Sequence, residues 1–218
     1  MADFTLVIGN KNFSSWSLRP WLALKQTGAA FEEVLVPLRK ADSRDRILAW
    51  SKSGKVPFLR HGKVEVWESL AICEYLAELF PAAGLWPADP AARAMARAVA
   101  TEMHAGFAAL RQNMPMDIRT SKPGEGRTPE VEQDIARIGE IWRACRAAHG
   151  GTKGNEGGPF LFGRFGNADA MYAPVVTRFA TYGVALDTVC QEYCAAVQAH
   201  PSMREWCDAA RAEKLTLD

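Results

Sequence analysis

The chain has 218 residues, of which 48% are hydrophobic and 23% charged, as is ordinary for a globular protein. Its 26 basic and 25 acidic residues give a formal net charge of +1, so we expect no field that would attract nucleic acid or a membrane surface. No apolar run approaches the ~20 residues that span a bilayer, and residues 1–10 have the pattern of a strand rather than of a targeting segment. We therefore expect a cytoplasmic protein with no nucleic-acid partner and no membrane partner.

The cysteines predict free thiols. Their number is odd and no two have the Cys-x-x-Cys spacing, which favours reduced side chains in a reducing compartment. No accompanying pattern of histidines or carboxylates indicates a metal site, so we expect none. The cysteines are Cys73, Cys145, Cys190, Cys194 and Cys207.

The first part of the chain alternates strands and helices. Its apolar patterns predict a strand at 4–8, a helix at 15–27, a strand at 31–38, a short helix at 43–50, a hairpin of strands at 57–60 and 64–67, and a helix at 69–80. Strand–helix–strand units favour parallel strands with right-handed crossovers, and the hairpin adds antiparallel pairing. The order predicts an α/β thioredoxin-like N-terminal domain over residues 1–81.

The rest of the chain is predicted to be helical. Three prolines and a glycine interrupt the pattern between 81 and 90, so we place a linker at 82–89. Helices are then predicted at 90–113, 130–149, 167–183, 189–200 and 202–214, with a glycine-rich loop at 150–159. Residues 90–218 should therefore form an all-α C-terminal domain.

Three hydroxyls gather at the start of the first helix, in Ser14-Ser15-Trp16-Ser17. One serine there is expected as a helix cap, but capping does not need three. A hydroxyl that donates to a charged acceptor contributes about 1.5–3 kcal/mol, and a helix N-terminus adds about 0.3–1 kcal/mol for an anion. Together they can lower the pKa of a thiol from ~8.5 by about two units. The segment therefore predicts a site for the thiolate of a ligand.

Two further motifs suit the rest of a small peptide. Lys55-Val56-Pro57 precedes a strand, and in a thioredoxin-like layout such a proline is usually cis, with the backbone of the residue before it turned outward to pair with a ligand. Glu68-Ser69 precedes a helix. The Ser69 hydroxyl and the first amides of that helix suit a carboxylate, and Glu68 suits the ammonium group beside it.

These segments resemble those of the cytosolic glutathione transferases, and the likeness extends over essentially the whole chain. The serine-type bacterial members and the zeta class are most similar, through residues 14–19, 54–59, 68–76 and 85–87. The resemblance implies the glutathione transferase fold, glutathione as co-substrate, a small electrophile as second substrate, and a homodimer with a role such as detoxification.

The resemblance also implies roles for single residues. Ser14 would activate the thiol, with Ser15 or Ser17 assisting. Val56, before a cis-Pro57, would pair with the cysteinyl unit of glutathione.

Charged and polar residues would hold the two ends of glutathione. Glu68 and Ser69 would hold the γ-glutamyl end, and Lys40 or Lys55 would neutralise the glycine carboxylate. Arg111 lies in a segment similar to one that supplies a polar residue to the site in the zeta class. The wall of the acceptor pocket would include Phe13, Trp16, Phe107 and Met114.

Two alternatives remain open from the sequence. A zeta-like isomerase of the maleylacetoacetate type is one, although Trp16 stands where the zeta class has a cysteine. A non-catalytic binding module with the same fold is the other. A mechanism that uses a cysteine of the protein itself is disfavoured, because none lies in the first 72 residues.

Overall fold

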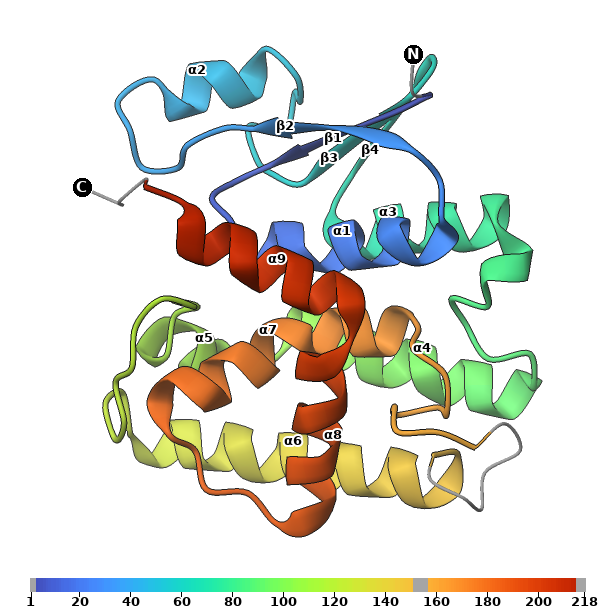
Figure 1. Cartoon of the computed structure of the whole chain (residues 1–218), viewed down its shortest axis with the longest axis vertical. Coiled ribbons are helices and arrows are strands. Elements are labelled where there is room, and N and C mark those ends of the chain that lie inside the picture. The colour runs from blue at the N-terminus through green and yellow to red at the C-terminus, as the bar shows by residue number, and fades with distance from the viewer. Residues whose placement is uncertain (1–2, 151–156, 215–218) are drawn as a thin grey trace.

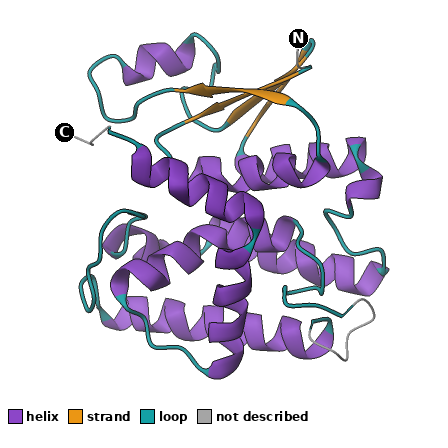
Figure 2. Ribbon diagram, viewed as in Figure 1, coloured by secondary structure: helices purple, strands orange, loops and turns teal. Residues whose placement is uncertain are grey.

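The computed structural model describes residues 3–150 and 157–214, so most of the glycine-rich loop expected at 150–159 lies outside it. A small sheet with helices on both sides stands above a body of helices (Figure 1), and the strands are confined to the N-terminal part of the chain (Figure 2). The sequence prediction of a thioredoxin-like domain followed by a helical domain is confirmed.

The N-terminal part has the predicted order of elements. These are β1 (Phe4–Ile8), α1 (Ser15–Thr27), β2 (Phe31–Leu35), α2 (Ser43–Leu48), β3 (Phe58–His61), β4 (Val64–Trp67) and α3 (Ser69–Leu79). Within the described residues the strands form one mixed sheet of order β2-β1-β3-β4, in which β1 is parallel to β2 and antiparallel to β3. The β3–β4 hairpin is antiparallel as well.

The alternation of side chains along β1 divides the core between two faces of the sheet. Phe4, Leu6 and Ile8 face the main core, which includes α1 and α3, whereas Val7 joins a small cluster with Ile47 of α2. All five residues of β1 are buried, as expected for a central strand covered on both faces.

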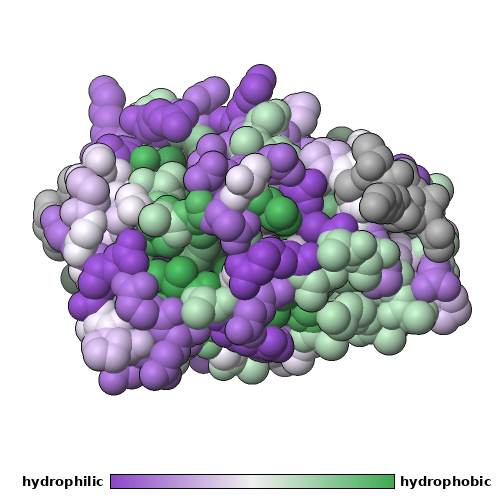
Figure 3. All heavy atoms as spheres, turned by 90° about the horizontal axis from the view of Figure 1, so that it is seen from below, coloured by the Kyte–Doolittle hydropathy of each residue, from purple (hydrophilic) through white to green (hydrophobic). Residues whose placement is uncertain are grey.

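The remaining elements are helical. They are a 3₁₀ turn η1 (Pro81–Ala83), α4 (Pro90–Ala105), α5 (Ala108–Asn113), α6 (Pro129–Ala148), α7 (Asn167–Tyr182), α8 (Thr188–Ala199) and α9 (Pro201–Ala212). Several begin with the expected signals: Asp89, Thr128 and Asp187 cap α4, α6 and α8 through their side chains. On the face of the helical domain seen in Figure 3, hydrophilic side chains surround apolar ones that show in the hollowed middle.

The single helix predicted at 90–113 is two helices. Phe107 adopts a left-handed conformation with φ +58°, which interrupts the helix. A side chain at Gly106 would approach the carbonyl of Glu102 to 2.8 Å, so the break also depends on glycine. The first turn of α5 is held from α6, where Asp134 Oδ2 accepts from the Leu110 amide at 2.9 Å.

The second strand and the second helix are shorter than predicted. The predicted strand at 31–38 ends at Leu35, because the chain turns toward the β1–α1 loop, where Asn10 Oδ1 accepts from the Leu38 amide at 2.7 Å. The predicted helix at 43–50 ends at Leu48, where the amides of Trp50 and Ser51 both turn to the Ile47 carbonyl.

Helix α1 joins the two parts of the molecule. It lies between the sheet and the C-terminal helices in Figure 1, and most of its residues are buried. Its N-terminal end therefore occupies the boundary between sheet and helical body.

Candidate active site

The three motifs singled out in the sequence meet at one cavity of ≈ 460 Å³, a size typical of small-molecule sites. Its lining includes Ser14, Ser15 and Trp16 at the start of α1, Lys55, Val56 and Pro57 ahead of β3, and Glu68 and Ser69 at the start of α3. Hydroxyls, a backbone edge and a helix N-terminus are thus presented to a single ligand.

Ser14 is the N-cap of α1, and its hydroxyl is already hydrogen-bonded to Ser17. Its Oγ accepts from the Ser17 amide at 3.4 Å and donates to Ser17 Oγ at 2.7 Å. Ser14 is 4% exposed on the cavity wall. To donate to a ligand, the Ser14 hydroxyl must turn away from Ser17.

The other two serines have different surroundings. Ser15 lines the cavity, and its hydroxyl makes no hydrogen bond to any residue that the structure describes. Ser17 does not line the cavity, because its Oγ is turned inward, where it accepts from the Gly9 amide at 3.0 Å and from Ser14. Ser17 thus supports Ser14 from behind.

Residues of the helical domain hold the loop that leads into these serines. Both oxygens of the Glu213 carboxylate accept from this loop, one from the Lys11 amide at 3.0 Å and the other from the Asn12 amide at 3.2 Å. Trp206 Nε1 donates to the Lys11 carbonyl at 2.9 Å, and Asn12 Nδ2 donates to Asp117 Oδ1 at 2.8 Å.

A free backbone edge borders the cavity at Val56. The Val56–Pro57 peptide bond is cis, as the thioredoxin-like layout led us to expect. Neither the amide nor the carbonyl of Val56 takes part in a hydrogen bond in the described part of the chain. Both groups therefore remain available to an extended peptide.

The start of α3 is an uncapped helix N-terminus. Glu68 occupies the cap position with φ +72° and makes no capping hydrogen bond with its side chain. Ser69 is 1% exposed, and its Oγ is buried with no partner among the described residues. An open helix N-terminus beside an unsatisfied buried hydroxyl fits a carboxylate.

His104 of α4, which the sequence reasoning missed, contacts two residues of the cavity wall without lining the cavity itself. Its Nε2 lies 3.6 Å from Glu68 Oε2, and its ring meets Trp16 edge-on with centroids 5.3 Å apart. Burial, with a contribution from the nearby Arg19 charge, lowers the pKa of His104. No local signal in the sequence marks His104, because its approach depends on how α4 packs against α7 and α3.

The predicted cationic residues are distributed differently. Lys55 is exposed on the cavity rim, whereas Lys40 is not part of the lining. Arg111 does not line the cavity either. Its Nη1 donates to the His104 carbonyl at 3.0 Å, close to the C-terminus of α4, where a cation is favoured.

The predicted acceptor wall is only partly present. Phe13 and Trp16 line the cavity, but Phe107 and Met114 do not. Met114 is fully buried in the main core, and Phe107 is 7% exposed there. Phe107 is drawn inward at the α4–α5 break and Met114 at the end of α5, and the sequence reading anticipated neither.

The described residues contain no cluster of three metal-binding side chains. The cysteine thiols are poor nucleophiles as well. Each of the five cysteines is free, and burial raises the pKa of each, for example to about 12 for Cys73. A thiol with a raised pKa is a poor nucleophile at neutral pH.

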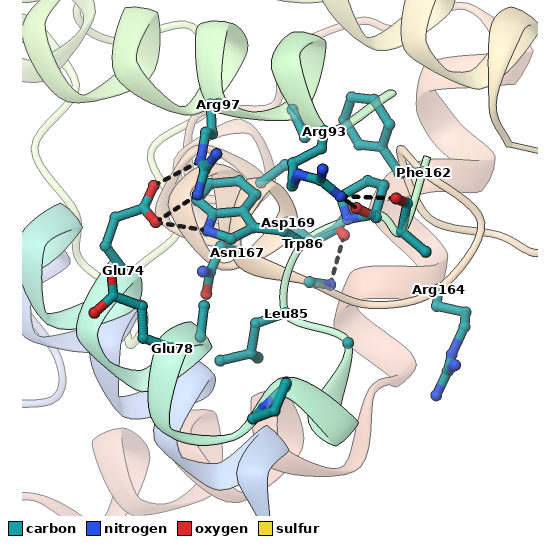
Figure 4. A pocket seen from close by; sticks show the side chains of 18 of the residues that line it. Glu74, Glu78, Leu85, Trp86, Arg93, Arg97, Phe162, Arg164, Asn167 and Asp169 are labelled. Atoms are coloured by element: carbon teal, nitrogen blue, oxygen red, sulfur yellow. Dashed lines mark hydrogen bonds and ion pairs between the residues drawn. The ribbon is translucent and has the colours of Figure 1, made fainter. Parts of the chain in front are cut away.

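A second cavity of ≈ 430 Å³ lies at the linker and shares no lining residue with the first (Figure 4). Trp86 Nε1 and the Arg97 guanidinium both bind the Glu74 carboxylate there, each within 3.1 Å. This network joins α3, the linker and α4, and the cavity lacks the serines of the first.

The sequence matches two protein-family models, which together cover most of the chain. The glutathione S-transferase N-terminal domain matches residues 13–79, and the glutathione S-transferase C-terminal domain matches residues 93–209. The chain belongs to the glutathione S-transferase family. The resemblance seen in the serine segment and in the later motifs is thereby confirmed.

Individual relatives of this glutathione S-transferase cover only part of it. It is 42% identical over 84 residues to protein LigF of Sphingobium sp., and 38% identical over 97 residues to a probable maleylacetoacetate isomerase of Caenorhabditis elegans. These matches cover 37% and 44% of this chain, and 33% and 44% of the relatives. The chain thus matches less than half the length of each.

The fold agrees with that of solved glutathione transferases. A glutathione transferase homolog from Burkholderia GL BGR1, crystallised with bound glutathione, has a TM-score of 0.69 at 24% identity and covers 98% of this chain and 100% of its own. No described helix is both long and apolar enough to cross a membrane.

Proposed function

We propose that this protein is a glutathione transferase that binds glutathione in the ≈ 460 Å³ cavity and transfers the glutathionyl group, through its sulfur, to a small electrophile. The observation that carries the proposal is the uncapped start of α3, where the buried Ser69 hydroxyl has no partner among the described residues and Ser69 lines the same cavity as Ser14 and Ser15. Bound glutathione in the Burkholderia relative supports the choice of ligand.

The parts of glutathione match the groups along the cavity. Ser69 and the first amides of α3 would hold the γ-glutamyl carboxylate, and Glu68 the neighbouring ammonium. The free amide and carbonyl of Val56 would pair with the cysteinyl unit, which directs the thiol toward Ser14. Lys55 at the rim is placed to neutralise the glycine carboxylate, and we retain Lys40 as the second candidate.

Ser14 would stabilise the thiolate by donating its hydroxyl, with Ser15 as a second donor. When the Ser14 hydroxyl turns to the sulfur, Ser17 Oγ keeps its bond from the Gly9 amide, so the inner network persists. The thiol proton is released to solvent, and the thiolate attacks an electrophilic carbon. As the new C–S bond forms, either the bond to a leaving group breaks and that group departs with the electron pair, or the π electrons of a conjugated acceptor move away from that carbon and are protonated from solvent. Of the predicted acceptor wall, Phe13 and Trp16 remain as the proposed contacts with that substrate.

Replacing Ser69 with alanine tests the ligand directly. We expect glutathione affinity, measured by titration calorimetry, to fall about 10- to 100-fold, because a charge-assisted hydrogen bond of about 1.5–3 kcal/mol is lost. The variant should keep its thermal stability, since the native hydroxyl has no partner to lose. Thr128→Ala is the matched control: its hydroxyl caps α6 through the Val131 amide, so stability should fall and affinity should not.

Other outcomes would change the proposal. Unchanged affinity in Ser69→Ala would mean that the carboxylate lies elsewhere. If the native protein does not bind glutathione at all, the transferase proposal fails, and a non-catalytic binding module becomes the better description.

The relative named as a probable maleylacetoacetate isomerase favours a second candidate, glutathione-dependent isomerisation. The two reactions differ in whether glutathione is consumed, because an isomerase returns it unchanged whereas a transferase converts it to product. Assays that follow free glutathione, with maleylacetoacetate and with a model electrophile, separate them.

We also propose that the protein is cytoplasmic and works as a homodimer. The family affiliation supports both, and the apolar side chains of Val64 and Trp67 on β4, which are 44% and 51% exposed, support the dimer. Sedimentation velocity should give a dimer, and Trp67→Lys should shift it toward the monomer. A monomeric native protein at micromolar concentration would contradict the proposal.

A further inference from the structure

A buried arginine at the boundary between the two domains has no counterion among the residues that the structure describes. Arg19 of α1 is 0% exposed, and its Nε donates to the carbonyl of Met171 on α7 at 3.2 Å. Its Nη1 and Nη2 are closed to solvent and have no hydrogen-bond partner among the described residues. Buried donors of a charged group are strongly unfavourable when unpaired, so this arrangement requires an acceptor.

Two more arginines, Arg111 and Arg178, are near enough for their charges to act on Arg19. Arg178 of α7 is 3% exposed, its Nε donates to the Met114 carbonyl at 2.9 Å, and its Nη1 is also buried without a partner. The guanidinium groups of Arg19 and Arg111 both lie against the Trp16 ring, 4.2 and 5.3 Å from its centroid. In residues 3–150 and 157–214, several arginines form ion pairs with carboxylates, but Arg19, Arg111 and Arg178 are not among them.

The cluster stays positively charged at neutral pH. Burial, together with the charges of Arg178 and Arg111, lowers the pKa of Arg19 only to about 9. Cys73, which would favour that charge if ionised, is neutral because burial raises its pKa to about 12. Asp134 favours the charge on Arg111, but its carboxylate accepts from the start of α5 rather than from an arginine.

We infer that Arg19, Arg111 and Arg178 bind a small monovalent anion of the size of chloride or bromide beneath Trp16. The anion accepts from the unpartnered Nη atoms of Arg19 and Arg178 and offsets their charge. It must be small, because these donors are closed to solvent and neither residue lines the ≈ 460 Å³ cavity. It bridges α1 and α7, so it ties the thioredoxin-like domain to the helical one, independently of any glutathione chemistry.

Bromide is the probe for this site. The thermal unfolding midpoint of the full chain is measured as sodium bromide replaces sodium gluconate at constant ionic strength, because gluconate is too large for the site. The native protein should show a saturable rise in midpoint, since a ligand that binds only the folded state stabilises it. In crystals grown in bromide, an anomalous peak should lie within hydrogen-bond distance of the Arg19 Nη atoms.

Matched variants separate binding from general salt effects. Arg19→Met should lose the saturable rise and be at least as stable as the native protein in gluconate, because an uncompensated buried charge is gone. Arg204→Met, at an exposed arginine of α9, should keep the rise. If Arg19→Met does not fold, Arg178→Met and Arg111→Gln replace it. Identical responses of the native protein and the cluster variants to bromide would overturn the inference.

Discussion

Replacing Ser14 with alanine should raise the pKa of the bound glutathione thiol by about one to two units, because the variant loses a hydroxyl that donates about 1.5–3 kcal/mol to the thiolate. The rate at neutral pH should then fall about tenfold or more and recover at alkaline pH, where the thiol ionises unaided. Titration of the ultraviolet thiolate absorbance in the presence of saturating protein measures the pKa directly. The variant should also lose about 1 kcal/mol of stability with its helix cap.

Ser15→Ala and Ser17→Ala locate the donor. Ser17 faces away from the cavity and holds the Gly9 amide, so its loss should lower stability and leave the thiol pKa nearly unchanged. Ser15 has an uncommitted hydroxyl on the cavity wall. If Ser15→Ala raises the thiol pKa and Ser14→Ala does not, the donor is Ser15, and Ser14 is only a cap.

Replacing Asp169 with alanine should destabilise the protein by about 2–4 kcal/mol, because two buried amides lose their acceptor. The Asp169 carboxylate is 1% exposed and accepts from the Leu161 amide at 3.1 Å and from the Gly166 amide at 3.0 Å. For a chain of this length, the unfolding midpoint should fall by about 5–15 °C.

Asp187→Ala is the control for this loss. Asp187 also caps a helix, by accepting from the Cys190 amide at 3.0 Å, but its side chain is 41% exposed. Its removal should cost only about 1 kcal/mol. Equal losses of unfolding free energy in the two variants would show that burial of the Asp169 carboxylate does not increase its contribution to stability.

The effect of Asp169 should depend on pH. Burial raises the pKa of its carboxyl to about 6, above the unfolded value. The stability that comes from this shift is therefore present at low pH and is lost as the pH rises through about 6. The difference in unfolding free energy between the native protein and Asp169→Ala should be larger at about pH 4 to 5 than at about pH 7.

Local sequence patterns predicted the elements and the cavity motifs well, because each depends on short-range chemistry. The alternation in β1, the serines at the start of α1 and the order of the β3–β4 hairpin are all visible within a few residues. Helix ends shifted where a distant partner intervened, as with Asp134 at the α4–α5 break and Asn10 beyond β2.

The site residues that the sequence missed or misplaced depend on packing between domains. His104 was missed because no local pattern places it beside Glu68 and Trp16. Arg111 was misplaced because its side chain turns to the carbonyls at the end of α4 instead of to the cavity. Arg19 is the sharpest case: within its helix it is an ordinary charged residue, and only the docking of α7 buries it completely.

The hydrogen bonds that join Glu213 and Trp206 to residues 11 and 12 make the N-terminal domain depend on the C-terminal one. A thioredoxin-like domain is often treated as an independent unit. Here the loop before the serines is held by hydrogen bonds to side chains about 200 residues later in the chain. Exchange of the helical half between relatives should therefore change the position of the serine loop as well, unless the side chains at positions 206 and 213 are carried along.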